Sequence, residues 1–215
     1  MSPAGLSRDA ARLRGLYAIA DTAVIRAGAL ATAVKAALDG GARAIQYRDK
    51  GGDPRRRGLE ARSLARLCRD AGALFIVNDD ATLAAEAGAD GVHIGREDAA
   101  LDECRHRLGA QAIIGVSCYN RLELAIEAER NGADYVAFGS FFASAVKPDA
   151  VHATLELLRA ARARLRVPIA AIGGITPENA PALVAAGADV LAVITGVFSQ
   201  PDIEAAARRY AALYL

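Results

Sequence analysis

Charged side chains follow several short apolar runs of this sequence. Arg48 ends one run and Lys50 comes just after it, Asp79 follows the next run, and Asp98 lies shortly after a third. Cations and carboxylates at one place imply a ligand that needs both. A polyphosphate with Mg²⁺ is such a ligand, because Lys and Arg bind phosphate oxygens and Mg²⁺ takes carboxylates together with substrate phosphates. The sequence therefore predicts that Asp79 and Asp98 share a Mg²⁺ ion.

A glycine pair, Gly173-Gly174, offers a second phosphate site. It follows another apolar run, and its backbone N–H groups, with those at the start of the next helix, could bind a phosphate. Plainer interpretations stay open at this point. The pair could be only a tight turn, the run Asn78-Asp79-Asp80 and Asp98 could cap helices, and the two cations could be solvated. If all these polar residues lay at one end of one fold, ligand binding would be favoured over these plainer interpretations.

The remaining reactive residue types indicate structure more than chemistry. His93 lies within an apolar run, which favours a hydrogen-bonded core residue over a base, and His106 and His152 fall in helical segments. No Ser/His/Asp set and no His-rich metal spacing occurs. The three cysteines lack the C-x-x-C spacing, so we expect reduced, structural thiols in a cytoplasmic protein.

The elements that must position these residues show a repeat. Gly-Ala recurs after Ala-rich, helix-like segments and before short apolar runs, as expected where glycine ends a helix and a strand begins. The pairs begin at residues 41, 72, 88, 109, 132 and 187.

Eight apolar runs alternate with segments of helical periodicity, which indicates βαβ units and a parallel sheet. We predict an α/β fold, a (β/α)₈ TIM barrel, with its active site at the carboxyl ends of the strands. The alternative, an open doubly wound sheet, would carry a Gly-rich turn after its first strand, where this chain has Ala20-Asp21-Thr22. The expected strands are 16–20, 44–48, 74–77, 91–94, 112–116, 135–138, 168–172 and 190–194, and helical periodicity is clear in 24–38, 55–70, 121–130 and 153–163.

Length and composition set the remaining limits. The 215 residues suit one domain, with 1–14 as a loose arm and 15–215 as a single catalytic barrel. With 53% hydrophobic and 24% charged residues and a net charge of +1, the chain suggests neither nucleic acid nor membrane as a partner. We find no signal peptide and no apolar run of transmembrane length. Small-molecule substrates are expected, and homo-oligomer formation is left open.

Six motifs follow one another over nearly the whole chain, at residues 46–50, 77–80, 90–98, 115–117, 133–137 and 171–175. Together and in this order they resemble the motifs of the thiamine-phosphate synthase family. This resemblance implies a Mg²⁺-dependent transferase. Its reaction condenses hydroxymethylpyrimidine diphosphate with hydroxyethylthiazole phosphate to give thiamine phosphate and diphosphate, by a dissociative alkyl transfer.

The resemblance also implies a division of labour among the site residues. Asp79 and Asp98 would hold Mg²⁺, and catalysis would rest on Arg48, Lys50, Ser117 and Lys147. The pyrimidine diphosphate would meet Gln46, Arg48, Lys50, Asn78, Ser117 and Lys147. The thiazole phosphate would meet Ser144, Val146, Gly173, Gly174, Ile194 and Thr195.

Three departures from the family pattern keep alternatives in view. Val146 stands where a threonine is usual, Arg96 stands where Gln is common, and Cys118-Tyr119 replaces small and His residues. A thiazole tautomerase-like paralogue would need a His near the end of the fifth strand. A phosphosugar epimerase or isomerase would need two Asp, Glu or His side chains that face the substrate and act as bases. Val146 favours a third alternative, a non-catalytic thiazole-phosphate sensor.

Overall fold

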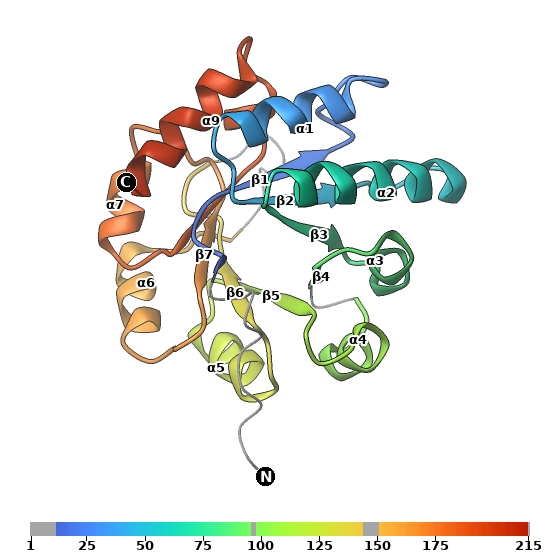
Figure 1. The fold of residues 1–215 in the computed structure, drawn as a ribbon. Coiled ribbons are helices and arrows are strands. Elements are labelled where there is room, and N and C mark those ends of the chain that lie inside the picture. The colour runs from blue at the N-terminus through green and yellow to red at the C-terminus, as the bar shows by residue number, and fades with distance from the viewer. Residues whose placement is uncertain (1–11, 96–97, 144–150, 215) are drawn as a thin grey trace.

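Eight parallel strands close into a barrel in the computed structural model, which describes residues 12–95, 98–143 and 151–214 (Figure 1). Each strand pairs with the next in the chain, and β1 pairs with β8, so no edge remains. The predicted barrel is confirmed and the open sheet is wrong. The strands are β1 Gly15–Asp21, β2 Ala44–Arg48, β3 Leu74–Asn78, β4 Gly91–Ile94, β5 Ile113–Tyr119, β6 Tyr135–Phe138, β7 Ile169–Ile172 and β8 Val190–Val193.

Helices surround the barrel and differ from the expected segments mainly at their starts. The helix expected from residue 24 begins at Leu30, because residues 23–25 instead form a turn bonded to Asp21. Two helices follow β8. The helices are α1 Leu30–Asp39, α2 Pro54–Asp70, α3 Ala81–Ala87, α4 Leu101–Leu108, α5 Leu122–Arg130, α6 Leu155–Arg162, α7 Ala180–Ala185, α8 Thr195–Phe198 and α9 Ile203–Ala211, with a final 3₁₀ turn, Ala212–Tyr214.

The Gly-Ala repeat ends helices as its composition predicted. All six glycines have positive φ. At the end of α3, Gly88 has φ 66° and donates its N–H back into the helix, and the next residue, Ala89, bonds Ala84 at 3.0 Å. A side chain at this φ would be strained, so glycine is the residue that lets the chain leave the helix and enter the next strand.

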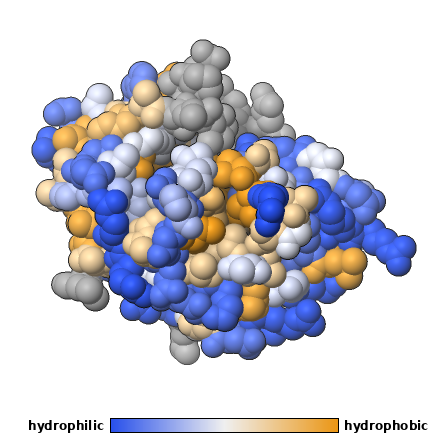
Figure 2. Space-filling model, turned by 90° about the horizontal axis from the view of Figure 1, so that it is seen from above, coloured by the Kyte–Doolittle hydropathy of each residue, from blue (hydrophilic) through white to orange (hydrophobic). Residues whose placement is uncertain are grey.

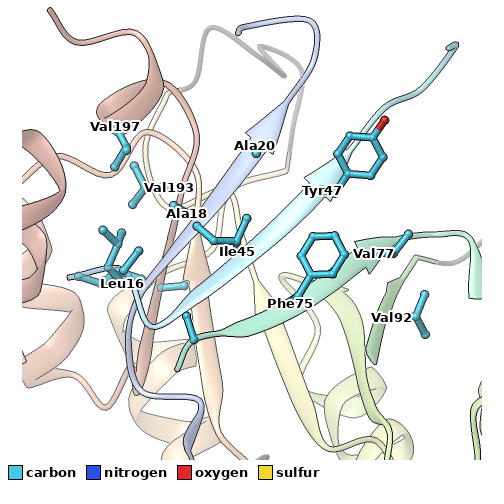
Figure 3. Close-up of a cluster of buried hydrophobic side chains, with 14 of the residues drawn as sticks. Leu16, Ala18, Ala20, Ile45, Tyr47, Phe75, Val77, Val92, Val193 and Val197 are labelled. Carbon is cyan, nitrogen blue, oxygen red and sulfur yellow. The ribbon is translucent and has the colours of Figure 1, made fainter. Parts of the chain in front are cut away.

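Strand residues divide between two packed layers because successive side chains alternate in direction. Outward-facing residues pack under the helices, and Figure 3 shows four of them on their strands, Ile45 and Tyr47 of β2 and Phe75 and Val77 of β3. Inward-facing residues fill the barrel itself, among them the fully buried Tyr135. The filled interior leaves the carboxyl ends of the strands as the place for a site.

The amino-terminal end of the barrel is closed by apolar side chains. Leu13 is 1% exposed and belongs to the barrel-filling cluster, and Arg12 donates to the Gly72 carbonyl at 2.9 Å. The last residues of the expected arm therefore pack on the barrel, while residues 1–11 lie outside the described part.

Hydrophilic side chains dominate the face shown in Figure 2. None of the described helices is both long and apolar enough to cross a membrane.

Candidate active site

A cavity of about 720 Å³ opens at the carboxyl ends of the strands. It gathers eight of the predicted site residues, which come from β2, β3, β5 and the segments after β7 and β8. These are Gln46, Arg48, Asn78, Ser117, Gly173, Gly174, Ile194 and Thr195. The cavity also takes in residues that sequence reasoning had not placed there, namely Tyr17, Tyr119, Ser140, Thr176, Ser199 and Gln200.

Arg48 is held in place by a carboxylate from the neighbouring strand. Its guanidinium donates to Asp21, which ends β1, lies in register with Arg48 and is 1% exposed. The same carboxylate accepts the Ala23 N–H at 2.9 Å. Sequence reasoning missed Asp21, although an acidic residue at the end of a buried strand is itself a signal. Its effect is to fix the planar donor fork of Arg48 at the cavity wall.

Lys50, Asp79 and Asp98 lie together after β2, β3 and β4, and with Arg48, which lines the cavity, they form the charged wall. The Lys50 ammonium donates to Asp79, and Asp98 accepts the Gly95 N–H at 2.6 Å. Burial, together with the adjacent Asp98 carboxylate, raises the pKa of Asp79 above its ordinary value, although Lys50 acts in the opposite direction. Two carboxylates this close repel each other, and a bound cation would relieve the repulsion.

The carboxylate pair has the composition that Mg²⁺ uses with a phosphate substrate. Among residues 12–95, 98–143 and 151–214, no three His, Cys, Asp or Glu side chains gather closely enough to hold a metal by themselves. Mg²⁺ is commonly held by one or two carboxylates, with substrate phosphates and water completing its shell. Asp79 and Asp98 therefore fit an ion that arrives with a diphosphate.

Helix capping does not account for these two carboxylates. The Asp80 side chain caps α3 by accepting the Leu83 N–H at 2.9 Å, while Asp79 sits at φ 64°, a strained conformation for a residue with a side chain. The residue before α4 is Ala100, which makes no side-chain cap bond. The capping alternative is thus true of Asp80 and wrong for Asp79 and Asp98.

The opposite wall is built from glycine backbone. Gly173 and Gly174 have φ values of 106° and 59°, and a Cβ on Gly173 would lie 1.9 Å from Ser140 Oγ. A Cβ on Gly174 would lie 2.3 Å from the Ala143 carbonyl oxygen. Both glycines are thus required by the close approach of the segment after β6.

Amides at this wall differ in part from those expected. Helix α7 begins only at Ala180, and the intervening Thr176 N–H is bonded to Asn179 at 2.9 Å. The helix near the glycine pair is α8, whose first internal bond runs from the Val197 N–H to Ile194 at 3.2 Å. The N–H groups of Thr195 and Gly196 precede that bond and stand at the start of the helix.

A chain of hydrogen bonds crosses the floor of the cavity. Gln46 Nε2 lies 2.7 Å from the Tyr17 hydroxyl, and the Tyr17 and Tyr135 hydroxyls are 3.0 Å apart. His93 Nδ1 lies 2.9 Å from the Tyr135 hydroxyl, and His93 Nε2 lies 2.9 Å from Ser117 Oγ. His93 is buried and hydrogen-bonded through both ring nitrogens, as the sequence indicated. The link to Ser117 was not foreseen.

The structure places some of the remaining sequence predictions, and others concern residues that it does not describe. Tyr119, with φ 56°, lines the cavity where a tautomerase-like site would need His. Cys68, Cys104 and Cys118 are buried and unpaired. Outside the described residues lie Arg96, Ser144, Val146 and Lys147.

Known proteins resemble this chain along almost all of its length. A family model described as thiamine monophosphate synthase matches residues 16–197. A thiamine-phosphate synthase from Nitrosococcus oceani is 56% identical over 198 residues, covering 92% of this chain and 91% of that protein. Another from Thioalkalivibrio sulfidiphilus is 53% identical over 203 residues, covering 94% and 96%.

A solved structure agrees with these sequence matches. Thiamine phosphate pyrophosphorylase from Pyrococcus furiosus superposes with a TM-score of 0.85 at 34% identity, covering 95% of this chain and 96% of that one. The family model covers most of the barrel and its mouth, including the charged wall and the glycine wall. The chain therefore belongs to the thiamine monophosphate synthase family.

Proposed function

We propose that this chain makes thiamine phosphate in the cavity at the barrel mouth, by joining hydroxymethylpyrimidine diphosphate to hydroxyethylthiazole phosphate. One observation carries the proposal. One cavity has Arg48 on one side and the Gly173-Gly174 backbone on the other, and Lys50, Asp79 and Asp98 lie next to Arg48 after β2, β3 and β4, so that two phosphate-bearing molecules can meet there. The membership of the family supports the same reaction.

The charged wall takes the diphosphate in this proposal. Arg48, fixed by Asp21, reaches the diphosphate from the cavity side, and Lys50 reaches it from the mouth. Asp79 and Asp98 would hold Mg²⁺, which when bound would supply positive charge beside the diphosphate. Lys147, outside the described residues, adds a further cation in the family pattern.

The glycine wall takes the thiazole phosphate. The amides of Gly173 and Gly174 and those at the start of α8, with the Thr195 hydroxyl, are donors suited to a phosphate. Ile194 provides apolar surface for the thiazole ring beside them. Ser144 and Val146 belong to the same subsite by resemblance only.

In this reaction the protein has to position the two substrates and stabilise the charge that develops. The carbon–oxygen bond of the pyrimidine methylene breaks, and its electron pair leaves with the diphosphate. The thiazole nitrogen then donates its lone pair to that carbon, and the new carbon–nitrogen bond leaves the positive charge on the ring. No proton has to move, which agrees with a site whose side chains orient and neutralise instead of acting as bases.

Incubation of the purified chain with both half-substrates and Mg²⁺ tests the proposal. We expect thiamine phosphate and an equal amount of diphosphate, detected by chromatography with mass spectrometry. Binding of the thiazole phosphate without any product would favour the sensor instead. Conversion of the thiazole to an isomer without condensation would favour the tautomerase-like paralogue.

A further inference from the structure

The hydrogen-bonded chain on the cavity floor joins two groups that face the substrate. It starts at Gln46 of β2 and ends at Ser117 of β5, and both residues line the cavity. Between them lie Tyr17, Tyr135 and His93, from three further strands. Tyr135 is fully buried and does not line the cavity, so it can act on a substrate only through its neighbours.

One assignment of donors and acceptors gives both tyrosine protons an acceptor within this chain of hydrogen bonds. An amide nitrogen can only donate, so Gln46 Nε2 donates to the Tyr17 oxygen, and the Tyr17 proton goes on to Tyr135. The Tyr135 proton then points to His93 Nδ1. His93 consequently carries its proton on Nε2 and donates to Ser117 Oγ, leaving the serine hydrogen for another acceptor. Burial raises the pKa of both tyrosines, which keeps both protons in the chain.

We propose that Tyr135 is a positioning residue that sets the His93 tautomer, so that Ser117 presents a hydrogen-bond donor and Gln46 presents its carbonyl oxygen to the substrate. The polarity suits an N–H of the pyrimidine at Gln46 and a phosphate oxygen at Ser117. In naming those groups the inference rests on the proposed function. The direction of the hydrogen bonds does not depend on the proposed function.

The fold reserves space for the Tyr135 ring. A Cβ on Gly115, which lies in register with Tyr135 on the neighbouring strand, would stand 2.0 Å from its ring. The ring stacks on His93, with centroids 5.4 Å apart and an interplanar angle of 28°, and meets Tyr17 edge-on. Gly115 thus lets the hydroxyl of Tyr135 reach both Tyr17 and His93.

Tyr135→Phe tests the role by removing one hydroxyl and keeping the ring. We expect kcat with the pyrimidine diphosphate to fall by about tenfold to a hundredfold, the loss typical of one hydrogen bond to a charged group. The KM for the thiazole phosphate should stay within about twofold of its original value. Tyr47→Phe is the matched control, since that buried hydroxyl bonds Glu60 on the outer side of the barrel at 2.7 Å. Equal loss in both variants, in proportion to lost thermal stability, would mean a structural role and overturn the proposal.

The tautomer gives a readout that needs no activity. The chain has three histidines, so ¹⁵N-histidine spectra contain few signals. We expect His93 protonated on Nε2 in the natural protein and in Tyr47→Phe, whose hydroxyl bonds Glu60 outside this chain of bonds, but a mixture of tautomers in Tyr135→Phe and in Tyr17→Phe, since both cut the link to Gln46. An Nδ1–H tautomer in the natural protein, or a pattern that Tyr135→Phe leaves unchanged, contradicts the inference. A natural protein with this tautomer pattern and no thiamine phosphate product would count against the proposed function alone.

Discussion

The charged wall and the glycine wall offer different chemical groups to a phosphate. The charged wall, after β2–β4, presents acidic and basic side chains, Arg48, Lys50, Asp79 and Asp98, whereas the wall after β7 and β8 presents glycine backbone and helix-start amides. Side chains bring full charge and can share a metal ion. Backbone donors bring fixed geometry and tolerate no added Cβ. The difference teaches that the same chemical group, a phosphate, can be bound in one site by two mechanisms, of which one is sensitive to the removal of a side chain and the other to the addition of one.

The charged wall itself contains two kinds of ion pair. The Arg48 partner, Asp21, is almost fully buried, so removing Arg48 would leave a buried charge and could cost about 3–5 kcal/mol of stability. The Lys50 side chain is 58% exposed, and exposed pairs contribute only about 0.2–1 kcal/mol. Lys50 is therefore the cleaner probe of binding, because its loss should leave the fold intact.

Removing the carboxylates should have the largest effect and would break the comparison on its charged side. We expect Asp79→Ala and Asp98→Ala each to lower kcat/KM by roughly a hundredfold or more, about 2.7 kcal/mol, because the Mg²⁺ would lose half its protein ligands. Steady-state rates at several Mg²⁺ concentrations measure this. Asp98→Asn, which keeps an acceptor for the Gly95 N–H, separates charge from loop structure. Full activity of the natural protein in EDTA would rule the metal out.

A methyl group on the glycine wall should have the next largest effect. In Gly174→Ala the new Cβ meets the Ala143 carbonyl at 2.3 Å, so the two segments must move apart. Gly132→Ala is the control, because its φ of 91° is also positive but nothing lies within 4 Å of a Cβ there. Positive φ alone costs a side chain about 1–3 kcal/mol, roughly 2–4 °C in Tm per kcal/mol.

The two glycine variants should therefore share a loss of thermal stability but differ in binding. We expect Gly174→Ala to raise the KM for the thiazole phosphate by about tenfold and Gly132→Ala to leave it unchanged. Thermal unfolding and initial rates together make the comparison. The backbone wall would lose its assigned role if Gly174→Ala bound the thiazole phosphate normally.

Val146→Thr should have the smallest effect on turnover. A restored hydroxyl would add one hydrogen bond to a phosphate, about 1.5–3 kcal/mol at most, so thiazole-phosphate binding should tighten by up to ten- to a hundredfold. Turnover should stay similar, because the glycine amides already hold the group. Initial rates at varied thiazole phosphate measure both effects. An inactive natural protein that Val146→Thr makes active would instead favour the sensor.

The barrel and the position of its site could be predicted because their signals are local. Strand and helix periodicity alternate along the chain, and each Gly-Ala pair marks a helix end, so the parallel sheet follows from short windows of sequence. Parallel strands then bring their carboxyl ends to one side. The cavity consequently contains Gln46, Arg48, Asn78 and Ser117, as the motifs indicated.

The contacts that depend on register could not be predicted in this way. Asp21 meets Arg48 because β1 and β2 pair in one particular register, and the sequence does not state the stagger of a barrel. Tyr17 and Tyr135 are 118 residues apart and meet only across the closed interior. Choosing Asp80 over Asp79 as the helix cap likewise required the backbone angle at Asp79.

Binding of each half-substrate to Lys50→Ala tests the division between the two walls most directly. Calorimetry would measure the affinity of the pyrimidine diphosphate and of the thiazole phosphate separately, for the natural protein and the variant, with Mg²⁺ and with EDTA. We predict that Lys50→Ala and EDTA each weaken pyrimidine-diphosphate binding by about tenfold or more and leave thiazole-phosphate binding within about twofold. Equal weakening of both ligands, or of neither, would contradict the assignment of the diphosphate and its metal to the charged wall.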